Sequence, residues 1–581
     1  MPVVVSDWLR RRWKPRRNRK GLFGKAICLG TLLLGVSCGV SARVDDGVNL
    51  LAGDWSHVDG ARMTAQGLMV TGLGRGIVPP ADDPDAPVMA NPPINLRGPV
   101  LKVSGDFALT ARLKRPLGAR LTFYGTLPYN QDEWRQEGQA VTLKVNKRKL
   151  ILELQDGIDD PKRRAFVIDR QKLRRKGDIE LTLARIGRRL TVTVDGQTVI
   201  NVADPGLFDS GEIRIGVDAP VGRKFFLAAL TARALNEDSR LEKVDSSIPR
   251  FSPPPDSLRR LAERRYPHLK IGTAVAAIPL LSDSDYARVL GEQFNMVTPE
   301  NVMKFQFIHP QPDRYAFADA DAIVDFAELN HMAVHGHTLA WKEALPRWVT
   351  EGNHDDDELE HILAEHIATV VGRYKGRIAS WDVINEPFEP FGSELRTGSP
   401  WYQAMGEDYI AFALREAHRA DPDAKLYIND YALEHRGPKS DAMYELAKSL
   451  LEDGVPLHGI GFQMHEDMTD DYQPIGVDAF RENVQRFIDL GLEVRISEMD
   501  VNLQEDDSRK RLKQQAKYYR DIFELAKEKR AFTAFSIWGF TDRYSSLQDW
   551  WNEEGFGNGL IFDTQKKPKP AYHSLKSSLE E

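Results

Sequence analysis

The C-terminal part of the chain alternates short strand-like segments with helix-like segments. One connecting segment carries Leu359, Ile362, Leu363, His366 and Val370, which follow the i, i+3, i+4 spacing of a helix with one buried face. Strands separated by helices predict parallel βαβ units, because parallel neighbours need a crossover connection. Eight units in about 320 residues predict a (β/α)8 barrel. The eight strand-like segments are Ile271–Ala276, Met296–Glu300, Ala333–Leu339, Ser380–Asn385, Lys425–Asp430, Gly459–Met464, Glu493–Glu498 and Ala534–Trp538.

A doubly wound open sheet is the alternative fold for such an alternation. It is disfavoured because no Gly-rich dinucleotide fingerprint follows the first strand-like segment. The barrel is therefore the predicted fold of residues 257–581.

The region from 44 to 235 has a different, all-β pattern. Apolar and polar residues alternate in Phe107–Leu113, Ala140–Val145 and Leu190–Val194, and Asp195-Gly196 is a two-residue hairpin signal. Many short strands joined by turns predict a two-sheet sandwich. The order of the last strands resembles laminin-G or concanavalin-like jelly rolls. Residues 236–256 are polar and then Pro-rich, which predicts a linker.

The N-terminus, residues 1–42, has the pattern of a secretory signal. A basic stretch from Arg10 to Lys25 precedes the apolar run Ala26–Val40, which ends in small residues. About 15 apolar residues are short for a membrane anchor, which needs about 20, so cleavage is favoured over retention. Both cysteines, Cys28 and Cys38, lie in this segment, so a mature chain has neither disulfides nor cysteine ligands for metals. We expect a secreted, periplasmic or cell-surface protein without a stable membrane partner.

The overall composition is that of a globular protein, with 42% hydrophobic and 28% charged residues. The formal net charge of -7 gives no reason to expect a nucleic-acid partner, which would require a basic surface. No Gly-rich phosphate loop or Ser or Cys nucleophile elbow is present. His337 and His465 lack the clustering of a metal site, so no metal and no cofactor are expected.

Polar side chains gather at the ends of the predicted strands. Because the carboxyl ends of all strands of a (β/α)8 barrel meet at one rim, these side chains are predicted to converge there. In strand order they are Glu300, Asn301 and Lys304; His337; Asn385 and Glu386; Asn429 and Asp430; Gln463 and His465; Glu498 and Asp500; and Trp538.

Glu386 and Glu498 are the candidate catalytic pair. They are separated by 112 positions, about three βα units, which places them on the fourth and seventh strands, across the barrel mouth. Glycosidic cleavage needs one carboxyl group to protonate the departing oxygen and a second to attack or stabilise the anomeric carbon. The alternative for each glutamate alone is an ordinary salt-bridged carboxylate at a strand end.

Several motifs in this region resemble those of family 10 glycoside hydrolases, the endo-β-1,4-xylanases. The resemblance spans about Leu258 to Leu575, with the motifs in the family's order. They are Thr298-Pro-Glu-Asn-Val-Met-Lys304, Gly336-His-Thr-Leu-Ala-Trp341, Trp381-Asp-Val-Ile-Asn-Glu-Pro387, Arg495-Ile-Ser-Glu-Met-Asp500, Trp538-Gly-Phe-Thr-Asp542 and Lys567-Pro-Lys-Pro-Ala-Tyr572.

The resemblance implies a retaining double displacement on xylan or a related plant cell-wall polysaccharide. It implies that Glu386 is the general acid/base, Glu498 the nucleophile and Asn385 the partner of the sugar 2-hydroxyl. It further implies that His465 binds Glu498, and Asp500, on the same strand face, can orient that histidine. The implied substrate-binding residues are Glu300, Asn301, Lys304, His337, Trp341, Asn429, Gln463 and Trp538.

The chain departs from the family pattern around the cleft. Lys342 and Ala344 replace a histidine and a glutamine that the family often has after Trp341, and Phe305 stands where tryptophan is common. Ser546 replaces an expected second tryptophan, although Trp550 and Trp551 follow it. These departures leave two alternatives open: an enzyme acting on another β-glycan or on short oligosaccharides, and an inactive carbohydrate-binding protein.

The sandwich has two alternative roles: it binds polysaccharide, or it serves as a spacer. Trp55, Tyr124, Tyr129 and Trp134 are candidate stacking residues for sugar rings, and each can equally belong to the apolar core.

Overall fold

The computed structural model describes residues 47–581 except 73–93, 128–138, 147–148, 157–165, 173–176, 205, 221, 391, 469–472, 505 and 549–557. Residues 47–581 belong to one compact unit. Within the described ranges, no helix is long and apolar enough to cross a membrane. The predicted signal segment, Tyr129, Trp134, Trp550 and Trp551 lie outside the described residues.

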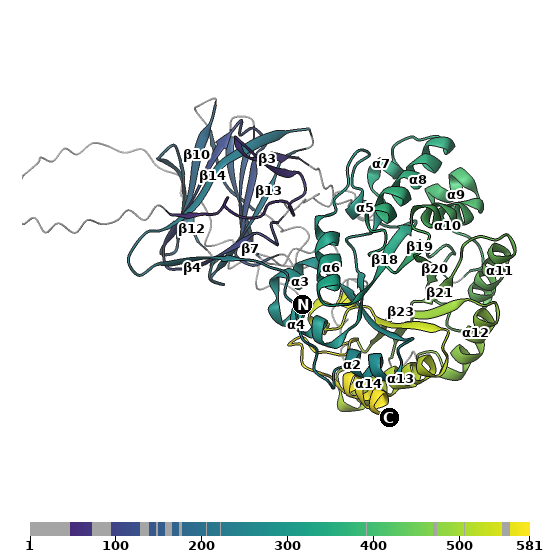
Figure 1. Ribbon diagram of the computed structural model, residues 1–581. Helices are drawn as coiled ribbons and strands as arrows, with labels where there is room; N and C mark the ends of the chain where they lie inside the picture. Colours follow the sequence, from purple (N-terminus) through teal and green to yellow (C-terminus); the bar gives the residue numbers. More distant parts are fainter. Residues whose placement is uncertain are drawn as a thin grey trace, which may run out of the picture. The chain divides into compact units, whose positions relative to one another are not determined.

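The N-terminal region consists of two antiparallel sheets (Figure 1). The first, in the order β12-β11-β10-β5-β14-β3-β2 with β1 on β14, contains β1 (Val48–Asn49), β2 (Ala61–Thr64), β3 (Gly67–Thr71), β5 (Phe107–Lys114), β10 (Ile179–Ile186), β11 (Arg189–Val194), β12 (Gln197–Ala203) and β14 (Lys224–Ala234). The second, in the order β15-β4-β13-β6-β7-β8-β9, contains β4 (Pro99–Ser104), β6 (Arg120–Tyr124), β7 (Gln139–Asn146), β8 (Lys149–Asp156), β9 (Phe166–Lys172), β13 (Glu212–Asp218) and β15 (Arg240–Asp245).

The two sheets share one apolar core, which follows from the period-two sequence pattern. Leu109 and Leu183 of the first sheet and Leu121 and Leu143 of the second are buried in the same cluster. The predicted hairpin is present: Val194 pairs with Gln197 around Asp195-Gly196. The φ angles of +48° and +80° at these two turn residues are those that such a tight hairpin requires. The likeness to laminin-G or concanavalin-like jelly rolls stays a prediction.

Two details of the N-terminal region differ from the sequence predictions. Arg240–Asp245, inside the predicted linker, forms β15 and pairs with β4, so the linker prediction is wrong for these residues. Leu241 of this short strand lies opposite Val103 of β4. The polar residues on either side of Leu241 made the segment look like a linker in the sequence. Trp55 and Tyr124 are only 3% and 1% exposed, so both are buried and not free to stack on a sugar.

The C-terminal region is a closed parallel barrel ringed by helices (Figure 1). Strand β16 pairs with both β17 and β24, and β21 pairs with β23, which closes the ring. Each predicted strand is present. The strands are β16 (Lys270–Val275), β17 (Met296–Pro299), β18 (Ala333–Ala340), β19 (Ser380–Asn385), β20 (Lys425–Asp430), β21 (Gly459–Phe462), β23 (Glu493–Asn502) and β24 (Phe532–Ile537), with a short β22 (His465–Asp467) beside β23.

The helices follow the strands in alternation, as the sequence predicts. Helix α8 shows the local reason: Asp355 and Glu358 form a capping box, and Leu363, His366 and Val370 are buried on one face. The helices are α2 (Leu258–Arg265), α3 (Ala277–Ser282), α4 (Ser284–Gln293), α5 (Phe305–Ile308), α6 (Ala318–Leu329), α7 (Arg347–Thr350), α8 (Asp356–Arg373), α9 (Pro400–Met405), α10 (Asp408–Ala420), α11 (Pro438–Glu452), α12 (Val477–Asp489), α13 (Arg509–Glu528) and α14 (Pro570–Glu580), with 3-10 turns η1 (Asp542–Tyr544) and η2 (Ser546–Gln548).

A column of stacked rings supports the rim near β18. The Phe305 ring lies 3.8 Å from the His366 ring and 5.7 Å from the Trp401 ring, and the His309 ring lies 5.5 Å from that of His366. The Trp401 indole N–H donates to the backbone carbonyl of Trp341 at 3.3 Å. Through this hydrogen bond the column of rings supports the backbone directly after β18.

The buried imidazole of His309 makes the stability of the barrel dependent on pH. Burial lowers its pKa to about 4, whereas the unfolded chain takes up this proton near pH 6.5. The unfolded state therefore binds more protons as the pH falls from 6.5 toward 4, and the stabilisation is lost in that window. We expect about 2 kcal/mol of the barrel's unfolding free energy to be lost from this group between pH 7 and pH 5.

Urea unfolding followed at pH 7 and pH 5 measures this difference. His309→Gln is expected to reduce the difference by about that amount, while replacement of the exposed His573 by glutamine leaves it unchanged. An unaltered pH difference in His309→Gln would rule out this role of His309.

Candidate active site

Glu386 is the first residue after β19, on the rim of the barrel. Its backbone N–H donates to the carbonyl of Asn429 at 2.8 Å, and its φ of +51° lies in the left-handed region. Such a conformation is unfavourable for a glutamate and persists only where the surroundings fix it, which is common at functional sites. The backbone therefore fixes the direction in which this carboxylate points.

Glu498 lies within β23 and is almost fully buried, with its side chain 6% exposed. Its Oε1 accepts from Asn429 Nδ2 at 2.6 Å and its Oε2 lies 3.2 Å from His465 Nε2. Nδ1 of the same histidine lies 2.7 Å from Asp500 Oδ2. The predicted contacts among Glu498, His465 and Asp500 are thus present.

The charges of this trio are set by burial and by each other. Burial disfavours the cation of His465, but the charge and hydrogen bond of Asp500 and those of Glu498 outweigh it and raise the pKa of His465 to about 10. Burial likewise works against the Glu498 carboxylate, but the hydrogen bond and charge of His465 hold its pKa below the usual range. At neutral pH the trio therefore contains an ionised Glu498 and a protonated His465.

Two asparagines bridge the carboxylates of Glu386 and Glu498. Asn385 Nδ2 donates to Glu386 Oε1 at 3.3 Å, and Asn429 Nδ2 lies 2.9 Å from Asn385 Oδ1 and 2.6 Å from Glu498 Oε1. Gln463 gives a second link. Its side-chain Nε2 donates to Glu386 Oε1 at 3.2 Å, and its backbone carbonyl accepts from the backbone N–H of Glu498. The two carboxylates therefore share one polar network, as their strand positions predict.

The other oxygen of Glu386 has a different environment. Trp341 Nε1 donates to Oε2 at 3.1 Å, and Arg396 Nη2 lies 3.2 Å from the same oxygen. The sequence interpretation assigned no role to Arg396, which lies in the loop between β19 and α9. The signal was weak, because the loop carries no strand or helix that would place an arginine at the rim.

A second buried charge cluster lies beneath the rim and was also missed. Asp382, on β19, has Oδ2 2.9 Å from His337 Nδ1 and Oδ1 3.0 Å from His335 Nε2. Burial opposes the Asp382 carboxylate, but the two histidines hold its pKa well below the usual range. Asp382 stands within the motif Trp381-Asp-Val, so its position on a buried strand was the available signal. It orients His337.

Lys304 contacts three of the other predicted substrate-binding residues. Its Nζ donates to Asn301 Oδ1 at 2.7 Å and lies 5.2 Å from the Trp341 ring and 6.0 Å from the Trp538 ring. The Trp538 ring meets His337 edge-on at 5.2 Å. These groups thus form one wall of the mouth. Glu300 is buried directly after β17. The pKa of Tyr286 is raised mainly by the burial of that tyrosine and further by the charge of Glu300.

Side-chain atoms of His337, Asp382 and Glu498 lie within 4.8 Å of one another, close enough to hold a metal ion. Among the described residues, this is the one group of three possible metal ligands with such spacing. The asymmetry of the two glutamates points to acid/base and nucleophilic chemistry instead: Glu498 is buried and ionised, and Glu386 is more exposed, at 13% of its side chain.

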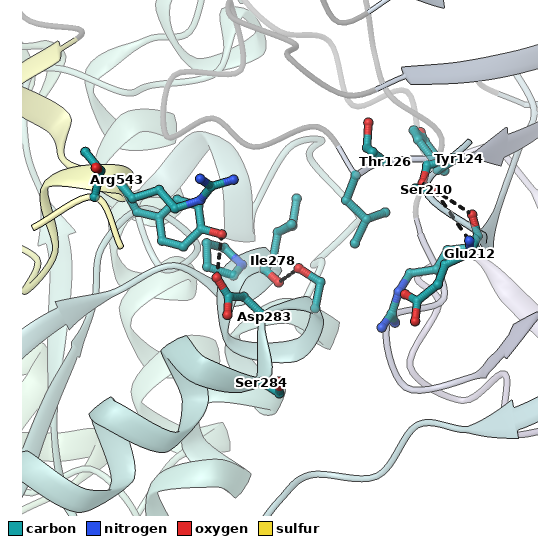
Figure 2. A pocket seen from close by; sticks show the side chains of 15 residues that line it. Tyr124, Thr126, Ser210, Glu212, Ile278, Asp283, Ser284 and Arg543 are labelled. Atoms are coloured by element: carbon teal, nitrogen blue, oxygen red, sulfur yellow. Dashed lines mark hydrogen bonds between the residues drawn. The ribbon is translucent and has the colours of Figure 1, made fainter. Parts of the chain in front are cut away.

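A cavity of about 740 Å³ is lined by other residues (Figure 2). Its barrel side contains Asp283, whose Oδ2 accepts from the Tyr544 hydroxyl at 2.8 Å, and Arg543. Tyr124, a candidate stacking residue of the sandwich, is among the lining residues, but none of the predicted catalytic or substrate-binding residues of the barrel lines this cavity. The catalytic candidates therefore belong to a separate part of the barrel.

The positions that depart from the family pattern lie in the segment after Trp341 and in η2. Lys342 follows Trp341 directly, and the end of its side chain lies beside Gly398. Ala344 has a φ of +52° and its carbonyl accepts from the Gln306 N–H. Ser546 is buried at 4% exposure in η2. A serine there offers no ring for a sugar to stack on.

Comparisons with known proteins match the barrel. A family model described as glycosyl hydrolase family 10 matches residues 257–578. Endo-1,4-beta-xylanase B of Thermotoga neapolitana is 42% identical over 325 residues, which cover 56% of this chain and 92% of the relative. A beta-1,4-xylanase of Dictyoglomus thermophilum is 40% identical over 313 residues, covering 52% of this chain and 87% of the relative.

Solved structures give the same result. Xylanase 10B from Thermotoga petrophila RKU-1, in complex with xylobiose, is 43% identical with a TM-score of 0.53 and covers 56% of this chain and 97% of its own. Native xylanase 10B from Thermotoga maritima is 44% identical with a TM-score of 0.53, covering 56% and 98%. These matches span about the length of the barrel.

Replacing Asp382 tests whether the buried charge cluster holds the site together. Asp382→Asn replaces the carboxylate that faces His335 and His337 by an amide and leaves a single acceptor oxygen for them. We expect it to lower the unfolding free energy of the barrel by about 2 kcal/mol, because a buried histidine N–H is then left without its carboxylate acceptor. Thermal and urea unfolding measure the loss.

Asp441→Asn is the matched control, because Asp441 forms an ion pair with Arg486 but is 59% exposed. Its replacement is expected to change the stability by less than about 1 kcal/mol. Equal effects of the two replacements would contradict the role assigned to Asp382.

Proposed function

The chain belongs to glycosyl hydrolase family 10, and we propose that its barrel is an endo-1,4-β-xylanase that hydrolyses internal β-1,4 bonds of xylan with retention of configuration. One observation carries the proposal. An ionised, buried Glu498 beside protonated His465 is joined through Asn429 and Asn385 to a second, more exposed glutamate, Glu386. This is the two-carboxylate arrangement that glycoside cleavage requires.

In the first step Glu498 attacks the anomeric carbon while Glu386 gives its proton to the departing glycosidic oxygen. The carbon–oxygen bond to the leaving sugar breaks, and an ester bond between the glycone and Glu498 forms. The low pKa of Glu498 keeps it ionised for attack. The cation of His465 orients this carboxylate and contributes to keeping it deprotonated.

In the second step Glu386, now a carboxylate, takes a proton from a water molecule that attacks the anomeric carbon. The ester bond to Glu498 breaks, and Glu386 regains its proton. Two displacements at one carbon give net retention. Both glutamates thus return to their starting states.

The remaining predicted residues bind the glycone. We assign Asn385 to the 2-hydroxyl of the sugar at the point of cleavage. Lys304, Trp341 and Trp538 form a cationic and aromatic wall on which a sugar ring can pack. Glu300, Asn301, His337, Asn429 and Gln463 complete the polar lining of the site.

A second candidate substrate is another β-glycan or short oligosaccharides. Ala344 and the buried Ser546 favour it, because they remove an amide and a ring that the family often has near the cleavage point. A missing stacking ring costs on the order of 1 kcal/mol in sugar binding. The loss affects affinity and substrate choice more than the chemistry of the two glutamates.

We also propose that the enzyme is exported, because residues 1–42 combine a basic stretch, a short apolar run and small residues before a cleavage point. The expected mature protein begins directly after Ala42. N-terminal sequencing of protein recovered from the producing cells and their medium tests this, and a retained basic stretch would refute it.

Hydrolysis of xylan, cellulose and mixed-linkage glucan by wild type and two variants tests the function. We expect wild type to act on xylan and to release oligosaccharides from internal bonds. Glu498→Gln should reduce kcat on xylan by about 10⁴-fold or more, and Glu386→Ala by about 10²- to 10⁴-fold.

Two outcomes would decide against the proposal. Unchanged hydrolysis in both variants would remove the assigned pair from catalysis. Activity of wild type on another glycan, with none on xylan, would establish the second candidate instead. NMR of the reaction mixture identifies the anomer that is released first. Release of the β-anomer first is the result expected for retention of configuration.

A further inference from the structure

Arg396 is a buried cation held against the acid/base glutamate. Its side chain is 8% exposed, and Nη2 lies 3.2 Å from Glu386 Oε2. A guanidinium does not lose its proton in proteins, so this charge is present throughout the reaction. A general acid beside a permanent cation is an unusual pairing, because the cation opposes protonation of the carboxylate.

The guanidinium is fixed from several directions. Nε donates to the Phe388 carbonyl at 2.8 Å, Nη2 donates to the Tyr431 hydroxyl at 3.0 Å, and Nη1 lies 3.5 Å from Glu343 Oε1. The backbone N–H of Arg396 donates to the Pro387 carbonyl at 2.8 Å. The planar group therefore cannot follow a moving carboxylate, and the carboxylate is held against it instead.

The two oxygens of Glu386 consequently have unequal partners. Oε2 lies against Trp341 Nε1 and Arg396 Nη2, and both of these groups can only donate. Oε1 lies against the side-chain amides of Asn385 and Gln463, at 3.3 Å and 3.2 Å. The amide of Gln463 offers an oxygen as well as a nitrogen, so it can adapt to a proton on Oε1, while Asn385 stays oriented by Asn429.

A proton on Oε2 would point at two N–H donors, one of them charged. A proton on Oε1 leaves both donors to Oε2 satisfied. From this geometry we propose that Arg396 is a positioning residue that fixes Oε2 of Glu386 and confines the acidic proton to Oε1, on the side of Asn385 and Gln463. The inference rests on the proposed function, because it concerns the role of Glu386 as acid/base.

Other charged groups near Glu386 do not replace Arg396. Asp430 is buried, and burial, opposed by Lys439 and assisted by the charge of Glu386, raises its pKa to about 7. Lys439 Nζ lies 2.7 Å from Asp430 Oδ1 and 3.6 Å from the Tyr431 ring centre. Lys439 is thus matched to Asp430, and Glu343 contacts Arg396. Arg396 is therefore the cation in direct contact with Glu386 among the described residues.

Removing Arg396 should have two separable effects. Loss of its charge removes the cation beside the acid/base carboxylate and is expected to move the basic limb of the kcat/KM pH profile to higher pH. Loss of the guanidinium lets the Glu386 carboxylate rotate. This rotation slows proton donation to a poor leaving group. A substrate whose leaving group needs no proton should be nearly unaffected in the first step.

The test compares full-length wild type, Arg396→Met and Arg396→Lys on xylohexaose and on a dinitrophenyl β-xylobioside. For Arg396→Met we expect a fall of about 10- to 100-fold in kcat/KM on xylohexaose, a fall of less than about 3-fold on the aryl substrate, and a shift of the basic limb to higher pH. Arg396→Lys should restore the limb but not the full rate, because lysine supplies the charge without the planar fork.

Tyr431→Phe and Arg347→Met are the controls. The first removes one contact of the guanidinium and leaves its ion pair, so the basic limb should stay in place. The second replaces an arginine that pairs with Glu351 in the same barrel but is 59% exposed, and it should behave as wild type. If Arg396→Met does not fold, Arg396→Lys and Tyr431→Phe still distinguish charge from position.

Equal falls of Arg396→Met on both substrates, with an unmoved basic limb, would overturn the inference, because a merely structural lesion affects both. The proposed function fails differently, through absence of xylan hydrolysis by wild type or unchanged activity of Glu498→Gln. The ratio between the two substrates for Arg396→Met is independent of those results.

Discussion

Closure of the parallel barrel is the constraint on which the catalytic site depends. The ring closes where Ile460 of β21 faces Val494 of β23 and where Ile271 of β16 faces Phe535 of β24. Since all eight strands run in the same direction, their carboxyl ends share one rim. Glu386 and Glu498 become neighbours through two asparagines because of this closure, although they are far apart in the sequence.

Burial makes each charge on this rim dependent on a partner. A carboxylate inside a protein is costly unless a cation or several donors compensate it. Glu498 has His465, Asp382 has two histidines, and Glu386 has Arg396. The partners differ in kind, since imidazole can titrate and guanidinium cannot.

The N-terminal sheets are stabilised by a different principle. Their strands alternate apolar and polar residues, so one face of each sheet packs into a shared core. Trp55 belongs to that core, and Tyr124 is 1% exposed beside the cavity of Figure 2, which removes two of the four candidate stacking residues. The reported comparisons cover the barrel.

The amino-acid sequence by itself determined the eight strands of the barrel, the Asp195-Gly196 hairpin and the strand ends that carry the catalytic candidates. These features depend on local periodicity and on the direction of parallel strands, which neighbouring residues encode. Tertiary structure alone decided the contacts of Asp382 and Arg396, the buried state of Trp55 and the pairing of β15. The physical reason is that a charge partner or a strand neighbour is chosen in space, by desolvation and packing between segments that have no fixed separation along the chain.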